Sequence, residues 1–163
     1  MGKSKKYGMN TKALHANKKF EPISGDIMPP LHLSTTYKND VPGESEYFYG
    51  RVNNPTRELF ERTLASLEGI DNYEGMHALA MASGMSAVSL IAELVKPGEN
   101  VVITKDVYGG TTNYFSKIVT ERGVEVNFCD FSDTETLKSM LNEKTKLAWI
   151  ESPSNPSINL YDL

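Results

Sequence analysis

The sequence has 163 residues, of which 39% are hydrophobic and 23% are charged, a composition typical of globular proteins. This length allows one domain, or one domain and part of another, and excludes a multidomain machine. The net charge is −4, but residues 1–20 hold six lysines and no acid, so the remaining chain carries 11 basic and 21 acidic side chains. Such an acidic body argues against nucleic-acid binding.

The sequence also argues against a membrane protein. Its longest apolar region, residues 87–95, contains Ser89 and Glu93 and is far shorter than the roughly 18 residues of a membrane span. The basic start lacks the apolar run of a signal peptide. The single cysteine, Cys129, cannot form an internal disulfide bond. We therefore expect a cytoplasmic protein with no membrane partner.

Residues 1–57 show little sustained periodicity and many turn-forming residues, such as Gly25, Pro29 and Pro30. A segment of this length is too long for a loop inside a compact domain. We expect residues 1–57 to form an arm that reaches a neighbouring subunit and residues 58–163 to form a domain. The arm's apolar and aromatic side chains favour this docking, and they include Phe20, Ile23, Leu31, Leu33, Tyr37, Tyr47, Phe48 and Tyr49.

After residue 57 the pattern becomes regular and alternates between helices and strands. This alternation predicts βαβ units and an α/β fold with a mostly parallel sheet. The apolar character of residues 85–95 predicts a helix buried against the sheet on almost every side. In chain order we predict a helix at 58–69, a strand at 76–82, a helix at 85–95, a strand at 101–104, a helix at 110–122, a strand at 124–129, a helix at 134–141 and a strand at 147–151.

Three polar or glycine-rich segments directly follow predicted strands, at residues 83–85, 106–110 and 152–156. Ligands of open parallel sheets bind beyond the carboxyl ends of the strands, so these segments are the candidate site. Ser83 and Gly84 precede a helix, whose free N–H groups and dipole suit an anion, although these residues on their own are better explained as a plain helix cap. No G-x-G-x-x-G or P-loop pattern is present, so neither a dinucleotide nor a nucleoside triphosphate is indicated.

Aromatic and polar side chains near these segments suggest a planar, phosphorylated ligand. Tyr108, followed by two glycines, could stack on a planar ring or could pack on its own domain. Asn155 could hydrogen-bond a ring substituent or could serve turn formation alone. Tyr49 and Arg51 would share one face of an extended segment, where a phenol and a guanidinium suit a phosphate, unless the arginine is only solvated. The three histidines show no ligand spacing, so no metal site is expected.

Five stretches together resemble the pyridoxal-phosphate-dependent enzymes of cysteine and methionine metabolism, the transsulfuration family. They occur in that family's order and spacing from about residue 11 onward. The stretches are PPLHLSTTY (29–37), YGRVNNPTR (49–57), ASGMSAV (82–88), DVYGGT (106–111) and TKLAWIESPSNP (145–156). The resemblance implies a fold-type-I transferase fold with helices on both faces of the sheet, a large domain that this chain contains only in part, and a pyridoxal 5'-phosphate cofactor.

The resemblance also implies a role for each candidate residue. Gly84 and Met85 would hold the cofactor phosphate through their backbone, and Tyr49 and Arg51 would reach the phosphate in the neighbouring subunit's site. Tyr108, the candidate catalytic residue, would stack on the pyridine ring, and Asn155 would contact the ring hydroxyl. The family's usual assembly implies a homo-oligomer, a dimer of dimers, whose N-terminal arms cross between subunits.

The implied activity is that of a carbon–sulfur lyase acting on a small sulfur amino acid. The overall motifs favour γ-elimination of cystathionine, with cystathionine γ-synthase, cystathionine β-lyase or methionine γ-lyase activity as alternatives. The family's cofactor-bearing lysine, the aspartate that pairs with the pyridine nitrogen and the arginine that binds the substrate carboxylate are not visible in these 163 residues. Lys105 and Lys146 each follow a threonine but stand in other motifs, so neither is assigned a catalytic role. The second hypothesis, from another class, is a short binding or oligomerisation protein that catalyses nothing.

Overall fold

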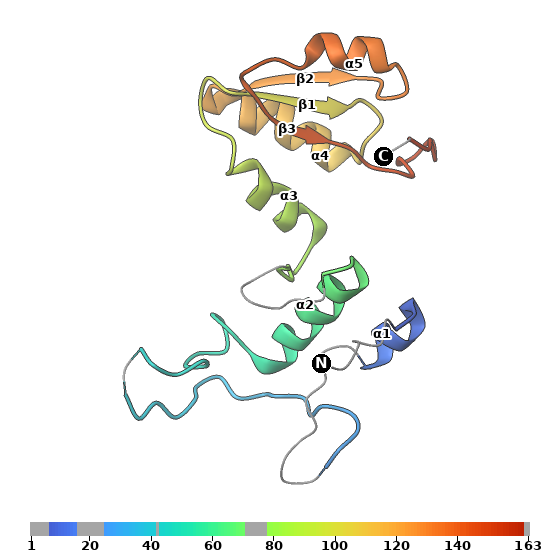
Figure 1. Cartoon of the computed structure of the whole chain (residues 1–163). Coiled ribbons are helices and arrows are strands. Elements are labelled where there is room, and N and C mark those ends of the chain that lie inside the picture. Colours follow the sequence, from blue (N-terminus) through green and yellow to red (C-terminus); the bar gives the residue numbers. More distant parts are fainter. Residues whose placement is uncertain (1–6, 16–24, 42, 71–77, 162–163) are drawn as a thin grey trace. The chain divides into compact units, whose positions relative to one another are not determined.

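The computed structural model describes residues 7–15, 25–41, 43–70 and 78–161 (Figure 1). The chain divides into two compact units, residues 1–80 and 81–163. This division falls later than residue 57, and the predicted boundary between arm and domain stays a prediction. No helix in the described part of the chain is long and apolar enough to cross a membrane.

The main helix of the first unit, α2, spans Pro55–Leu67. The side chain of Asn54 caps it by accepting hydrogen bonds from the N–H groups of Thr56 (2.8 Å) and Arg57 (3.4 Å). Pro55 occupies the first helical position, where its missing N–H costs nothing. The predicted helix over residues 58–69 is confirmed, but the cap and the proline place its start three residues earlier.

A short helix that the sequence pattern did not reveal, α1, spans Met9–His15. It contacts α2, and Lys12 Nζ donates a hydrogen bond to the carbonyl of Ser66 (3.1 Å). None of the residues of α1 is buried, which explains why no apolar periodicity marks it. The sequence analysis predicted no helix over residues 9–15.

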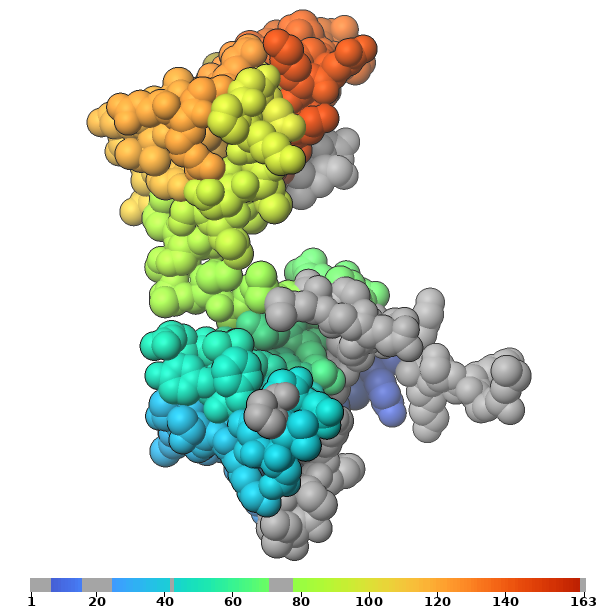
Figure 2. Space-filling model, turned by 90° about the vertical axis from the view of Figure 1, so that its left-hand side faces the viewer, coloured from blue at the N-terminus to red at the C-terminus, as the bar shows by residue number. Residues whose placement is uncertain are grey.

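Residues 35–37 and 48–50 pair with each other through their backbones. Thr36 and Tyr49 make an isolated antiparallel bridge, flanked by the bonds Gly50 N–H to Thr35 O (2.7 Å) and Tyr37 N–H to Phe48 O (3.2 Å). In Figure 2 the light-blue and teal surfaces of these two segments adjoin. A Cβ on Gly50 would lie 3.0 Å from the carbonyl oxygen of Ser34, so a glycine suits this close approach.

The strand predicted over residues 76–82 is absent from residues 78–82, and residues 76 and 77 lie outside the described residues. The N–H of Ala80 donates to Oε1 of Glu61, a buried side chain of α2 (2.8 Å). An N–H bonded to a side chain in this way is not available for a strand ladder. The apolar run at this place therefore predicted the wrong structure.

The second unit contains a three-stranded parallel sheet of order β2-β1-β3. The strands are β1 (Asn100–Thr104), β2 (Glu125–Cys129) and β3 (Thr145–Trp149). The central strand β1 is buried along its whole length. The predicted parallel sheet is confirmed, but β3 begins and ends two residues earlier than predicted, which leaves Glu151 beyond the end of the strand.

Helices cover both faces of this sheet, with α5 on the other side from α3 and α4 (Figure 1). The α3 helix spans Gly84–Ala92 and α5 spans Thr134–Met140. The α4 helix (Gly109–Asn113) continues as a π-helical segment, Tyr114–Val119, and a final 3₁₀ turn, Thr120–Arg122. The predicted helix over residues 110–122 is thus a single helical run whose middle part is widened.

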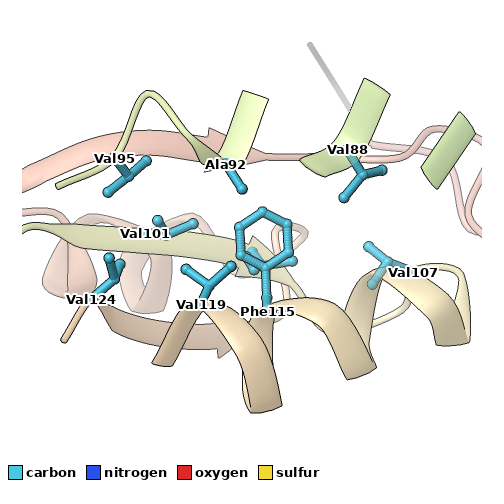
Figure 3. Packing of buried hydrophobic residues seen from close by; sticks show 9 residues of the cluster. Val88, Ala92, Val95, Val101, Val107, Phe115, Val119 and Val124 are labelled. Atoms are coloured by element: carbon cyan, nitrogen blue, oxygen red, sulfur yellow. The ribbon is translucent and has the colours of Figure 1, made fainter. Parts of the chain in front are cut away.

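Nine buried residues form the core between α3, β1 and the α4 run, as Figure 3 shows. Phe115 is fully buried and its ring points toward Val88 and Ala92 of α3. Leu90 and Leu94, in contrast, are 44% and 75% exposed, so the predicted burial of residues 85–95 on almost every side was wrong. Only the face of α3 that carries Val88 and Ala92 is buried.

Candidate functional site

The segments that follow β1 and β3 meet at the carboxyl end of the sheet, as predicted. The carboxylate of Asp106, just after β1, accepts hydrogen bonds from the hydroxyl of Ser154 and from Nδ2 of Asn159 (2.9 Å). Ser154 is buried, and its hydroxyl oxygen also accepts the N–H of Asn159 (2.8 Å). These bonds fix the segment after β3 against the segment after β1.

A second carboxylate, Glu151, links the same two segments. It accepts hydrogen bonds from the backbone N–H of Tyr108 (3.0 Å) and the hydroxyl of Thr111 (3.3 Å). It also accepts one from the indole N–H of Trp149 (3.2 Å). The sequence interpretation missed Glu151 because its predicted position was the last residue of a strand. The only sequence feature that pointed to a role for Glu151 was its place in the ESPSNP stretch, next to the candidate residues.

The amino end of α3 supplies a place for an anion. Ser83 caps the helix, and its hydroxyl and carbonyl oxygens accept the N–H of Ser86 (3.2 Å and 3.1 Å). The preceding N–H groups, at Gly84 and Met85, have no acceptor among the described residues. Beyond its chain neighbours and its own helix backbone, no described atom lies within 4 Å of the position that a Cβ on Gly84 would take. The space and the donors at this helix end therefore fit a phosphate group.

The ring of Tyr108 and the side chain of Met85, at the amino end of α3, both lie next to Gly110. A Cβ on Gly110 would overlap Cε1 of Tyr108 and would lie 3.0 Å from Sδ of Met85. The ring of Tyr108 thus lies against the Cα of Gly110, while 53% of the residue remains exposed. A partly exposed ring with one supported side can stack on a planar ligand. The structure brings Tyr108 and Met85 together, as the sequence led us to expect.

Asn155 lies in the loop that Ser154 and Asn159 close. The N–H of Ile158 donates to the carbonyl of Ser154 (3.1 Å), and the N–H of Ser154 donates to the carbonyl of Asn159 (2.9 Å). Asn155 itself is exposed, and its side-chain amide has no hydrogen-bond partner among the described residues. The loop is fixed through its neighbours, which leaves this amide able to bind a ligand.

Tyr49 and Arg51 belong to the first unit, and their side chains do come together there. The guanidinium of Arg51 lies over the ring of Tyr49, with its Cζ 4.7 Å from the ring centroid. The predicted extended segment was wrong, because the N–H groups of Val52 (2.9 Å) and Asn53 (3.1 Å) both bond to the carbonyl of Tyr49 and form a turn. The turn, and not strand alternation, brings the two side chains together.

The remaining reactive groups at the sheet edge give no alternative site. Cys129 ends β2, and burial raises the pKa of its thiol, which disfavours the nucleophilic thiolate. No group of three His, Cys, Asp or Glu side chains suited to a metal ion occurs in the part of the chain that the structure describes. The donors and the exposed aromatic ring of the second unit therefore fit a planar, anionic ligand best.

Comparison with known proteins gives a consistent result. A sequence profile described as "Cys/Met metabolism PLP-dependent enzyme" matches residues 10–163. A cystathionine beta-lyase of Coxiella burnetii is 40% identical over 162 residues, which cover 98% of this chain and 41% of that protein. A cystathionine gamma-lyase of Bos taurus is 39% identical over 155 residues, which cover 94% of this chain and 37% of that protein.

Solved structures agree with these sequence matches. The crystal structure of CalE6 from Micromonospora echinospora, described as a cystathionine gamma-lyase, matches with a TM-score of 0.85 and 37% identity. The match covers 96% of this chain and 40% of that one. The chain thus spans about two fifths of the length of the proteins that it resembles.

Proposed function

The chain belongs to the Cys/Met metabolism family of PLP-dependent enzymes, and from this membership we propose that the protein catalyses γ-elimination of cystathionine to cysteine, 2-oxobutanoate and ammonia. The family is one of lyases that use pyridoxal 5'-phosphate. The observation that carries the proposal is the site itself, where Tyr108 and the loop of Asn155 meet at the carboxyl end of the sheet. A cytoplasmic location stays a prediction.

The residues of the second unit fit the cofactor in three separate ways. The amides of Gly84 and Met85 would bind its phosphate at the amino end of α3, where the helix dipole favours negative charge. The ring of Tyr108 would stack on its pyridine ring, and the free amide of Asn155 would bind its hydroxyl. When bound, the cofactor supplies an electron sink for the bond broken at the substrate's α carbon.

This chain's own contribution is to position and orient the cofactor. The pyridine ring of the cofactor would lie on the ring of Tyr108. Glu151 holds the backbone of Tyr108, and Gly110 supports its ring. A planar group fixed on one face must accept the substrate on the other face, and this restricts the geometry of the reaction. Tyr108 is therefore the residue of this chain that we place against the reacting group.

We further propose that Tyr49 and Arg51 complete the site of a second copy of the chain. Arg51 is exposed, and its guanidinium lies over the ring of Tyr49, which orients its N–H donors for binding a phosphate. Residues earlier in the same unit expose large apolar side chains that would be covered in an oligomer, namely Ile27 (70%), Leu31 (76%) and Leu33 (90%). A dimer of dimers is the assembly proposed.

The reaction is tested on the protein as its own cells make it. The purified protein is assayed with cystathionine, and the oxo acid released is identified by mass spectrometry after reaction with a hydrazine. We expect 2-oxobutanoate together with cysteine. If a preparation that contains bound pyridoxal 5'-phosphate releases neither 2-oxobutanoate nor pyruvate, the lyase proposal is overturned and a non-catalytic binding protein is favoured.

β-Elimination is the second candidate, and the 40% identity to a cystathionine beta-lyase favours it. The same assay separates the two reactions because their products differ. Cleavage of the β carbon–sulfur bond of cystathionine releases pyruvate, ammonia and homocysteine, whereas γ cleavage releases 2-oxobutanoate, ammonia and cysteine. Pyruvate as the main product would replace the first proposal by the second.

A further inference from the structure

Glu151, in the segment that follows β3, binds the start of the α4 helical run. Its Oε2 accepts the N–H of Tyr108, which is the N-cap residue of α4, and its Oε1 accepts the hydroxyl of Thr111. Forty-three residues separate Glu151 from Tyr108 in the sequence. The contact therefore joins the end of β3 to the residue from which α4 starts.

This contact replaces a cap that the helix itself lacks. The side chain of Tyr108 makes no capping hydrogen bond. In a capping box, a Glu or Gln at the third helical position would accept the N–H of the N-cap residue. That position is Thr111 here, whose hydroxyl instead donates to Glu151. Glu151 supplies the missing acceptor from outside the helix, and its negative charge suits the positive end of the helical run.

We propose that Glu151 is a positioning residue, which fixes the backbone of Tyr108 and so sets the plane in which the Tyr108 ring meets the cofactor. This inference rests on the proposed function for the identity of the ligand, but the hydrogen bonds that carry it do not involve the ligand. Neither the sequence motifs nor the resemblance assigned Glu151 a role.

The carboxylate cannot be replaced by its amide, because all three of its partners can donate. With the Gln oxygen toward Tyr108, the amide N–H₂ would face the indole N–H of Trp149, which is a donor only. With the amide turned over, its N–H₂ would face the N–H of Tyr108 instead. Either orientation leaves one donor unpartnered, although Gln has almost the same shape as Glu.

The first measurement does not need the cofactor. Hydrogen–deuterium exchange of peptides that contain Tyr108 is followed by mass spectrometry in the wild-type protein and in Glu151→Gln, Glu151→Asp and Glu143→Gln variants. We expect the Tyr108 amide to exchange about tenfold faster in Glu151→Gln, because its acceptor is lost. Glu143→Gln, an exposed carboxylate before β3, is the matched control and should exchange as the wild type does.

The second measurement is the dissociation constant of pyridoxal 5'-phosphate. We expect binding about tenfold weaker in Glu151→Gln, with partial recovery in Glu151→Asp, which keeps the charge on a shorter side chain. Thermal unfolding shows whether each variant is folded. If Glu151→Gln is not folded, the cofactor affinity of Glu151→Asp is compared with that of the wild type instead. If Glu151 served only the stability of the fold, restoring the negative charge in Glu151→Asp would not restore the affinity for pyridoxal 5'-phosphate.

The two proposals fail in different ways. Equal exchange of the Tyr108 amide in wild type and Glu151→Gln, or equal cofactor affinity in both, overturns the positioning role. Slower Tyr108 exchange in wild type than in Glu151→Gln, combined with no cofactor binding by the wild type, supports the positioning of Tyr108 and overturns the proposed function.

Discussion

The ring of Tyr108 lies directly against Gly110, two residues further along, at a distance that leaves no room for a side chain. A Cβ at Gly110 would overlap Cε1 of Tyr108, and Sδ of Met85 lies on the same side. At Gly109, by contrast, no described atom beyond its two chain neighbours and its own helix backbone lies within 4 Å of the Cβ position. These adjacent glycines therefore allow the support of the Tyr108 ring to be tested.

Gly110→Ala should displace the Tyr108 ring, whereas Gly109→Ala should leave it in place. We expect the dissociation constant of pyridoxal 5'-phosphate to rise about three- to tenfold in Gly110→Ala, because aromatic stacking contributes about 0.5–1.5 kcal/mol. Both variants add one methyl group to α4, so the ratio of their affinities, measured by absorbance titration, isolates the ring contact. Equal affinities would contradict the support of Tyr108 by Gly110.

Tyr108→Ala should weaken cofactor retention, and Tyr108→Phe should preserve most of it. The alanine removes the stacking ring, while the phenylalanine removes only the hydroxyl, for which the structure gives no hydrogen bond among the described residues. We expect about a tenfold loss of affinity for the alanine variant. The measurement is the cofactor content after gel filtration, and unchanged content in Tyr108→Ala would mean that the ring does not stack.

Phe115→Ala should strongly destabilise the second unit. Phe115, in the α4 run, is fully buried in the core with residues of α3 and β1, and its ring centroid lies 6.0 Å from that of Trp149. Removing such a ring costs about 3–5 kcal/mol of the free energy of unfolding. Ile118→Ala, at a position in the same π-helical segment that is 49% exposed, should cost about 1 kcal/mol or less. Urea unfolding of both variants measures the difference.

Asp133 should make stability depend on pH in the acid range. It caps α5 by accepting the N–H (3.1 Å) and the hydroxyl of Thr136, and these bonds lower the pKa of its carboxyl below the usual 3.8. A carboxyl whose pKa is lowered on folding stabilises the fold above pH 3.8, and this stabilisation is lost as the pH falls through the lowered pKa.

The Asp133→Asn variant tests this pH dependence. Asn caps helices about as well as Asp but does not titrate, so stability near pH 6 should change little. Between pH 5 and pH 2.5 the wild type should lose more stability than the variant, as measured by urea unfolding at each pH. Identical pH profiles would show that the Asp133 cap does not depend on its charge.

The parallel sheet and its helices could be predicted from the sequence because their buried side chains form a regular pattern of apolar residues. Residues 101–103 are uniformly apolar, and the helix that follows this strand is buried along one face. The strand over residues 76–82 could not be rejected in the same way. Its apolar residues resemble a buried strand, and only the bond from Ala80 to Glu61 shows that its backbone is used elsewhere.

The site was predictable where its residues follow strands and less so where distant side chains support them. Tyr108 and Asn155 could be placed at the sheet edge from the order of the strands alone. Glu151 could not be assigned, because its role depends on three donors that only the folded chain brings together. The turn that pairs Tyr49 with Arg51 could not be predicted either, because backbone hydrogen bonds form it and the side-chain pattern does not mark them.

The order of the strands implies an order of folding. In β1, Asn100 pairs with Glu125 of β2, 25 residues later, and with Thr145 of β3, 45 residues later. Closing the longer loop costs about 0.5 kcal/mol more conformational entropy, and on the ribosome β2 is also synthesised first. Strands β1 and β2 can therefore pair while β3 is still being made. The Tyr108 backbone is fixed only when Glu151 has been added, so this part of the ligand-binding edge forms after β1 and β2 can already have paired.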